Sequence, residues 1–292
     1  MLGFGFAILS SLFYSLYVIP RKFSKLSPVV FSFFMAIAFA IGSVIIFLCQ
    51  PLIGFHETVS PILWWAVFAG VMWAAAFVCF IISIDLIGLA RSNQWKNLQG
   101  PVAVFLSFLF LQEFILVNPF YAIFAAAAIF FSALCFTIVE GTEKRLVVKG
   151  VFLALTSAVG FGAVGVIQKY VTDVSGVYLQ QVVWSLSIVL GLGIYLVLRK
   201  MIGEVFRSSL RDRVLGLLAG LLYIGASFSQ LFSYQHLAAS VAFTLIQLSA
   251  LWTILIGIIY FREIRFTKHW RRILFGFVLT IIGILALVFA KQ

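Results

Sequence analysis

A short polar segment interrupts an otherwise apolar stretch of the chain. Its side chains are Asn93, Gln94, Lys96, Asn97 and Gln99. An α-helix turns by about 100° per residue, so Asn93, Lys96 and Asn97 share one helix face. Pro101 lacks an N–H group, which leaves the carbonyl of Asn97 free at the same level. Because an amide and an ammonium bind polar solutes and are costly in apolar surroundings, the segment predicts a binding site that faces a cavity.

A second polar segment lies 150 residues further along the chain. It contains Thr244, Gln247 and Ser249, with Trp252 one turn beyond. Sliding the sequence by 150 residues places Asn97 on Gln247 and Leu98 on Leu248. This correspondence favours Gln247 as the main binding residue of the second segment, although an amide can equally form a hydrogen bond between helices.

Other polar and aromatic side chains stand inside apolar stretches and extend the predicted substrate-binding set. They are Trp73, Tyr14, Gln180 and Gln230, with Arg91, Tyr17, Trp184 and Tyr234 as weaker candidates. The competing interpretations are structural. Lys96 can reach toward the membrane surface or pair with Asp85, and tryptophans and tyrosines commonly form interfacial belts.

The elements that carry these residues are predicted to be transmembrane helices. The chain is 64% hydrophobic and only 10% charged, whereas soluble proteins carry about 25% charged residues. A span needs about 20 apolar residues whose backbone groups are all hydrogen-bonded within the helix. Ten stretches qualify, at 1–20, 28–49, 61–84, 88–111, 118–139, 148–169, 178–198, 213–235, 238–260 and 270–289. We therefore expect an all-α integral membrane protein.

The distribution of positive charge predicts the orientation. If successive loops alternate between the two sides, the loops after spans 1, 5, 7 and 9 hold 16 Lys and Arg residues, and the other side holds only Lys169 and Lys291. Basic loops face the cytoplasm, which places both termini outside, in a membrane predicted to be the bacterial inner membrane. The net charge of +11 is thus explained by topology, and no nucleic-acid partner is expected.

The 150-residue correspondence also predicts two copies of one unit. We expect five-helix repeats at 1–140 and 147–292, joined by a cytoplasmic linker at 141–146. Because five spans are an odd number, the second copy would enter the membrane from the opposite side, as in the inverted repeats of transporters.

Enzymatic and metal chemistry find no support in the sequence. The nine acidic residues fall in loops or at span ends, and the three cysteines and three histidines lack metal-ligand spacing. The glycines at 160, 162 and 165 match a dinucleotide fingerprint only literally, because no strand precedes them. We expect no enzyme, cofactor or metal, and close helix packing at these glycines and at Gly216 and Gly220.

Several short motifs resemble those of the drug/metabolite transporter superfamily. They are Gly70-Val71-Met72-Trp73, Leu86-Ile87-Gly88-Leu89, Phe110-Leu111-Gln112-Glu113 and Phe243-Thr244-Leu245-Ile246-Gln247-Leu248. The whole chain looks most like the glucose/ribose uptake branch. That resemblance implies ten helices in inverted repeats and uptake of a monosaccharide, often taken to be proton-linked, with Gln247 and Trp73 suited to sugar recognition. The sequence departs from the branch at residues 91–97, where a cation replaces small and hydroxyl residues.

The predicted function is therefore a secondary transporter or facilitator for a small polar metabolite, with a sugar-like solute first. The alternatives are an exchanger of anionic metabolites or sugar phosphates that uses Lys96, an amino-acid or drug exporter, or a structural or sensory membrane protein. The expected partners are a small-molecule substrate and membrane lipids, and a homodimer stays open.

Overall fold

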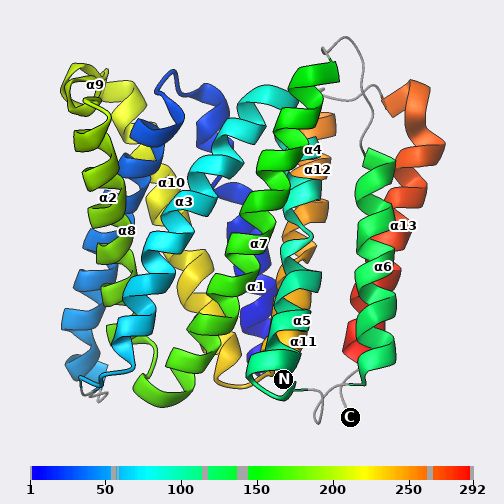
Figure 1. Cartoon of the computed structure of the whole chain (residues 1–292), viewed down its shortest axis with the longest axis horizontal. Helices are drawn as coiled ribbons and strands as arrows, with labels where there is room; N and C mark the ends of the chain where they lie inside the picture. The colour runs from blue at the N-terminus through cyan, green and yellow to red at the C-terminus, as the bar shows by residue number, and fades with distance from the viewer. Residues whose placement is uncertain are drawn as a thin grey trace. The chain divides into compact units, whose positions relative to one another are not determined.

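The computed structural model describes residues 2–53, 57, 59–113, 118–136, 144–261 and 266–289. Every regular element in these ranges is helical (Figure 1). The helices are α1 (Leu2–Leu16), η1 (Ile19–Phe23), α2 (Pro28–Cys49), η2 (Gln50–Ile53), α3 (Leu63–Ile87), α4 (Leu89–Lys96), α5 (Gln99–Phe110), α6 (Pro119–Phe136), α7 (Lys144–Ser175), α8 (Tyr178–Leu198), α9 (Ile202–Arg207), α10 (Leu210–Tyr234), α11 (Ala239–Ile246), α12 (Leu248–Ile259) and α13 (Phe266–Phe289). The backbone of Thr244 belongs to α11, but its side chain is not among the parts of the chain that the structure describes.

Seven helices among the described residues are long and apolar enough to cross a membrane. They cover Leu2–Phe23, Pro28–Leu52, Leu63–Ile87, Arg145–Ser175, Tyr178–Leu198, Leu210–Tyr234 and His269–Ala286. These long apolar helices agree with the all-α membrane protein that the composition predicts. Of the predicted linker, residues 144–146 form the start of α7, and residues 141–143 lie outside the described residues.

The spans predicted at 88–111 and 238–260 are each interrupted by a short turn, the first of them at the place where Pro101 favours a kink. The first is broken between α4 and α5, and the second between α11 and α12 (Figure 1). At the first break Pro101 has no N–H, and the carbonyl of Asn97 accepts instead from Gly100 N at 3.1 Å, which tightens the turn. At the second break Leu251 occupies the position that corresponds to Pro101, so this break has no such covalent cause.

The two broken helices share their dimensions. Helices α4 and α11 each contain 8 residues and start at positions 89 and 239, which are 150 apart. Helices α5 and α12 each contain 12 residues. Helices α3 and α10 each contain 25 residues, and their starts at 63 and 210 are 147 apart. The helix boundaries therefore recur at nearly the offset that the sequence comparison predicts.

The chain forms two compact units, each assembled from two separate stretches. Unit 1 comprises Met1–Val78 and Ile167–His236, and unit 2 comprises Cys79–Val166 and Leu237–Gln292. Helices α3 and α7 each contribute residues to both units. These units are defined by contacts in space, whereas the predicted repeats at 1–140 and 147–292 are defined along the sequence. The two repeats therefore stay a prediction.

Unit 1 is organised around α10, which packs against α1 and α2, while α2 also packs against α8. Close approach of α2 to α10 depends on the small residues Gly216 and Gly220, as predicted. A Cβ atom added at Gly220 would lie 2.7 Å from the Cβ of Ala38 and would overlap the carbonyl oxygen of Met35. In this unit the carboxylate of Glu57 also accepts hydrogen bonds from three backbone N–H groups at the start of α8.

Unit 2 pairs its helices in an antiparallel manner. Helix α4 packs against α12 and α5 packs against α11, so the two broken helices run in opposite directions. Helices α6 and α13 lie side by side (Figure 1). The hydroxyl of Ser132 on α6 joins them, because it donates to the carbonyl of Gly276 at 2.7 Å and lies 2.6 Å from Thr280 Oγ1.

Candidate functional site

The polar face of α4 is buried inside unit 2. Asn93, Lys96 and Asn97 are only 3%, 5% and 1% exposed. The side-chain nitrogens Nδ2 of Asn93 and Asn97 have no hydrogen-bond partner among the described residues. This face therefore carries hydrogen-bond donors that the fold itself leaves unused.

The ammonium group of Lys96 lies close to two aromatic rings that are in contact with each other. Its Nζ is 5.0 Å from the centroid of the Phe80 ring and 5.6 Å from that of Phe161. Phe80 comes from α3 and Phe161 from α7, and their rings meet edge to face at 6.4 Å. The described contacts of Lys96 include neither an ion pair nor a hydrogen bond, and Asp85, the predicted structural partner, is exposed.

The two ring contacts stabilise the Lys96 cation by less than its burial costs. A desolvated cation–π contact contributes about 2 kcal/mol, while burial of an ion costs several kcal/mol unless it is well paired. An ammonium also has three N–H donors, and ring faces are weak acceptors. Phe80 and Phe161, here called the aromatic bracket, therefore stabilise the position of Lys96. They leave the N–H donors of its ammonium available for hydrogen bonds.

Gln247 stands at the break between α11 and α12 and meets the break between α4 and α5. A Cβ atom added at Gly100 would lie 2.9 Å from Nε2 of Gln247, so the amide packs directly on this glycine. The Gln247 side chain is 0% exposed, and neither its Nε2 nor its Oε1 has a partner among the described residues. The two polar segments that the sequence singled out thus come together within unit 2.

Gln94 shows how differently a neighbouring amide behaves. It is also fully buried, but its Nε2 donates to the hydroxyl of Ser132 on α6 at 2.9 Å. This hydrogen bond joins α4 to the α6–α13 pair, a structural role. The amides of Asn97 and Gln247 have no such partner, so they are the better candidates for contact with a ligand.

The remaining candidates of unit 2 divide into buried and exposed residues. Arg91, Gln99 and Ser249 are buried. Trp252 does not join the group, because its ring is 45% exposed. Five residues of helix rotate its side chain by about 140° from that of Gln247, which turns it toward the surface.

In unit 1 the predicted residues form a separate hydrogen-bonded network. The hydroxyl of Tyr14 donates to Oε1 of Gln230 at 2.6 Å. Nε2 of Gln230 donates to the hydroxyl of Tyr234 at 2.7 Å and to Oε1 of Gln168 at 3.1 Å. Gln180 is engaged inside the unit, because it donates to the carbonyl of Gln168 at 3.0 Å and accepts from Thr172 at 2.6 Å. Gln180 therefore holds α7 to α8, a structural role.

The aromatic candidates of unit 1 gather around Tyr223. Tyr17 and Trp73 both have ring centroids 5.1 Å from that of Tyr223, and Tyr14 lies at 5.6 Å. Trp184 lies at 6.1 Å, and its indole N–H has no partner among the described residues. The cluster provides aromatic faces and hydroxyls but no charge.

Sequence reasoning missed four residues of these two groups. Gln168 could have been predicted, because it meets the criterion that identifies Gln180 and Gln230, a glutamine within an apolar span. Tyr223 and the bracket residues Phe80 and Phe161 had no distinguishing signal, because they are aromatic residues in a chain with 33 phenylalanines and 9 tyrosines.

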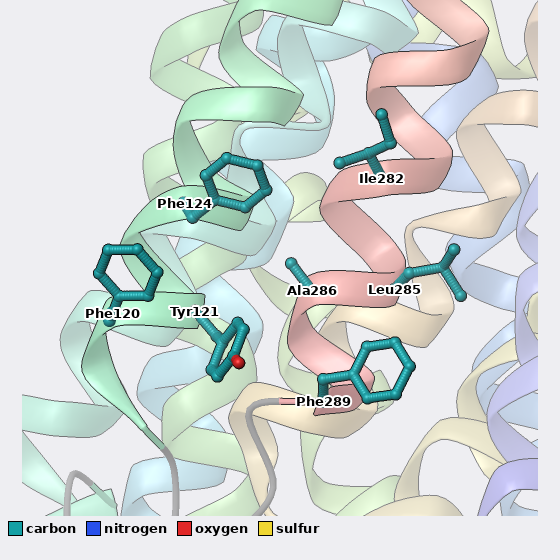
Figure 2. Close-up of a pocket in the computed structure, with 7 residues that line it drawn as sticks. All are labelled: Phe120, Tyr121, Phe124, Ile282, Leu285, Ala286 and Phe289. Atoms are coloured by element: carbon teal, nitrogen blue, oxygen red, sulfur yellow. The ribbon is translucent and has the colours of Figure 1, made fainter.

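A groove of about 400 Å³ lies elsewhere in unit 2, between the start of α6 and the end of α13 (Figure 2). It is lined by Phe120, Tyr121, Phe124, Ile282, Leu285, Ala286 and Phe289. None of the predicted site residues contributes to it. Its apolar lining suits hydrocarbon and offers nothing to a polar solute.

No protein-family model matches the chain, and no curated protein matches it. Among solved structures, 27 chains match it. One, a crystal structure of a protein with 12% sequence identity, has a TM-score of 0.71 over 99% of this chain and 98% of the other. At this identity the likeness concerns the fold alone, and it extends over nearly the whole chain.

Proposed function

We propose that this protein is a carrier that moves a small polar solute across a membrane by alternating access. The observation that carries the proposal is the pair of antiparallel broken helices, α4–α5 and α11–α12, with unpartnered polar side chains at both breaks. Irregular backbone at membrane depth is tolerated where it is enclosed by protein or lines a cavity. Secondary transporters typically place their substrate sites at such interrupted helices.

The proposal includes ten spans. Seven long helices account for seven of them, and α6, with 18 residues, is within the range of about 17–25 residues needed to cross. Helices α4–α5 and α11–α12 form the other two, each broken in the middle. The recurring helix lengths at offsets of 147 and 150 residues and the antiparallel pairing support two inverted repeats, and the resemblance to the drug/metabolite transporter superfamily supports the same class.

The proposed location is the bacterial inner membrane, with the basic loops in the cytoplasm and both termini outside. Orientation can be measured with a reporter fused to the C-terminus. We expect alkaline phosphatase to be active there and green fluorescent protein to be dark, because phosphatase folds only outside the cytoplasm and the fluorescent protein only inside. The opposite pattern would refute the argument from loop charge.

A sugar-like solute suits the uncharged aromatic and amide chemistry of unit 1. Tyr14, Gln230 and Gln168 supply hydroxyl and amide groups, and Trp73 and Tyr223 supply ring faces. A structural or sensory protein is the competing class. It has no need of buried polar atoms without partners, which cost about 1–3 kcal/mol each.

Counterflow in liposomes tests the carrier proposal. Vesicles that contain the purified protein and an unlabelled solute should take up trace labelled solute transiently above equilibrium. Glucose, sorbitol, gluconate, glycerol 3-phosphate and leucine sample the solute classes. We expect Asn97→Ala to reduce the rate by about 100-fold, because a site built to hydrogen-bond its solute depends strongly on each partner.

Thr156→Ala is the matched control for this assay. Thr156 is an exposed residue of α7 whose hydroxyl bonds only within its own helix. Its replacement should leave counterflow unchanged. Uptake no faster than in protein-free vesicles for every solute class, or equal rates in the two variants, would exclude a carrier that uses this site.

A further inference from the structure

We infer that the solute group bound in unit 2 is an oxyanion, a carboxylate or phosphate, held by Lys96 with the amides of Asn93, Asn97 and Gln247. This inference rests on the proposed carrier function and deepens it by naming the substrate class. It departs from the neutral monosaccharide that the sequence resemblance implies.

The first argument is an excess of donors. The unpartnered side-chain atoms of Asn93, Asn97 and Gln247 are three donors, one amide nitrogen from each residue, and one acceptor, Oε1 of Gln247. The ammonium of Lys96 adds N–H donors that meet only ring faces. Asn93 and Lys96 lie on α4, Asn97 is its C-cap, and Gln247 contacts Gly100 in the next turn. Such an arrangement calls for a ligand rich in acceptor lone pairs, and an oxyanion has the most.

The second argument is charge. Lys96 is a buried cation, and its described contacts include no carboxylate. A neutral sugar would leave this charge uncompensated, whereas an anion would pair with it in surroundings from which water is largely excluded. The ammonium is a compact point charge that binds phosphate or carboxylate without demanding a fixed planar geometry.

The third argument comes from the aromatic bracket. Phe80 and Phe161 lie on two different helices, and both ring centroids are within 5.6 Å of Nζ of Lys96. Cation–π contacts are weaker than charge-assisted hydrogen bonds. The two rings therefore do not prevent an oxyanion from accepting hydrogen bonds from the ammonium. The bracket thus presents the cation to a ligand.

Binding measurements on the purified protein test the inference without any transport step. The protein is placed in nanodiscs of phosphatidylcholine, and thermal stabilisation and calorimetric affinity are measured for matched pairs of solutes. Glycerol 3-phosphate is compared with glycerol, gluconate with sorbitol, and inorganic phosphate and acetate are added as minimal oxyanions. We expect the anion of each pair to bind and the neutral partner to have no detectable effect.

Three variants assign the binding to this site. Lys96→Met should weaken anion binding by about 30-fold or more, equivalent to about 2 kcal/mol. Lys96→Arg, which keeps the charge, should restore most of the affinity, and Asn97→Asp should weaken binding because it adds a negative charge. Lys169→Met is the control, because the ammonium of Lys169 already pairs with Asp173 in unit 1.

Several results would overturn the inference. They are equal binding of neutral and anionic partners, the absence of stabilisation by every oxyanion tested, or unchanged affinity in Lys96→Met. Stabilisation that occurs only when phosphatidylglycerol is added to the nanodiscs would identify a lipid headgroup instead and would also overturn it. Counterflow of a neutral solute without anion binding would leave the carrier standing and remove this inference, while anion binding without counterflow would do the reverse.

Discussion

Replacing Gln247 by leucine is expected to make the protein more stable and to abolish transport. The Gln247 side chain is completely buried, and its Oε1 and Nε2 both lack partners among the described residues. Each such atom costs about 1–3 kcal/mol, so leucine should raise the free energy of unfolding by a similar amount. The counterflow rate should fall by about 100-fold or more, because the solute loses a partner at the break between α11 and α12.

Gln94→Leu provides the matched control. Gln94 is an equally buried glutamine, but its Nε2 donates to Ser132 at 2.9 Å. Leucine at this position should therefore not stabilise the protein, because the lost hydrogen bond between α4 and α6 offsets the removal of the unpartnered Oε1 of Gln94. Thermal unfolding in detergent and counterflow in liposomes give the two readouts. A loss of stability in Gln247→Leu would mean that its amide is structural, and the carrier site would then have to lie elsewhere.

Replacing Gly220 by leucine is expected to cause a large loss of stability in unit 1. The added Cβ would overlap the carbonyl oxygen of Met35 and approach the Cβ of Ala38 to 2.7 Å. A backbone carbonyl cannot turn aside as a side chain can, so α2 and α10 would have to separate. Overpacking costs about 1–3 kcal/mol even when the core can adapt, and this site should be at or above that limit.

The graded series Gly220→Ala, Gly220→Val and Gly220→Leu separates this effect from a general intolerance of the helices. Unfolding free energy should decrease at each step. Gly5→Leu on α1 is the control, because a Cβ at Gly5 has no atom within 4 Å. Gly220→Leu with the stability of Gly5→Leu would show that α2 and α10 do not depend on their close approach.

Much of the fold was predictable because its causes are local. In hydrocarbon every backbone N–H and C=O needs a partner within its own helix, so apolar length alone indicates where helices form. Leu63–Ile87 and Leu210–Tyr234 illustrate this, since they overlap the spans predicted at 61–84 and 213–235 over nearly their whole length. The breaks were harder. Pro101 pointed to the first of them, but nothing in the residues around Gln247 predicted the second.

The candidate site was predictable in residue type and only partly in grouping. Any polar side chain in an apolar span is a candidate by residue type alone, so Asn93, Lys96, Asn97 and Gln247 were predicted together with Gln180 and Trp252. The structure separates these cases by packing. Gln180 is engaged with Gln168 and Thr172, and Trp252 is exposed on its helix.

The sequence by itself determined that the chain is helical, that its helices are apolar enough for a membrane, and which few polar groups those helices carry. These properties follow from composition and from helical periodicity, which act over a few residues. Only the tertiary structure decided which polar atoms find partners, because partners such as Ser132 for Gln94, or the rings of Phe80 and Phe161 for Lys96, come from other helices. A glutamine amide therefore joins two helices where a hydroxyl lies beside it, as at Gln94. It keeps an unused donor where a glycine lies beside it, as at Gln247.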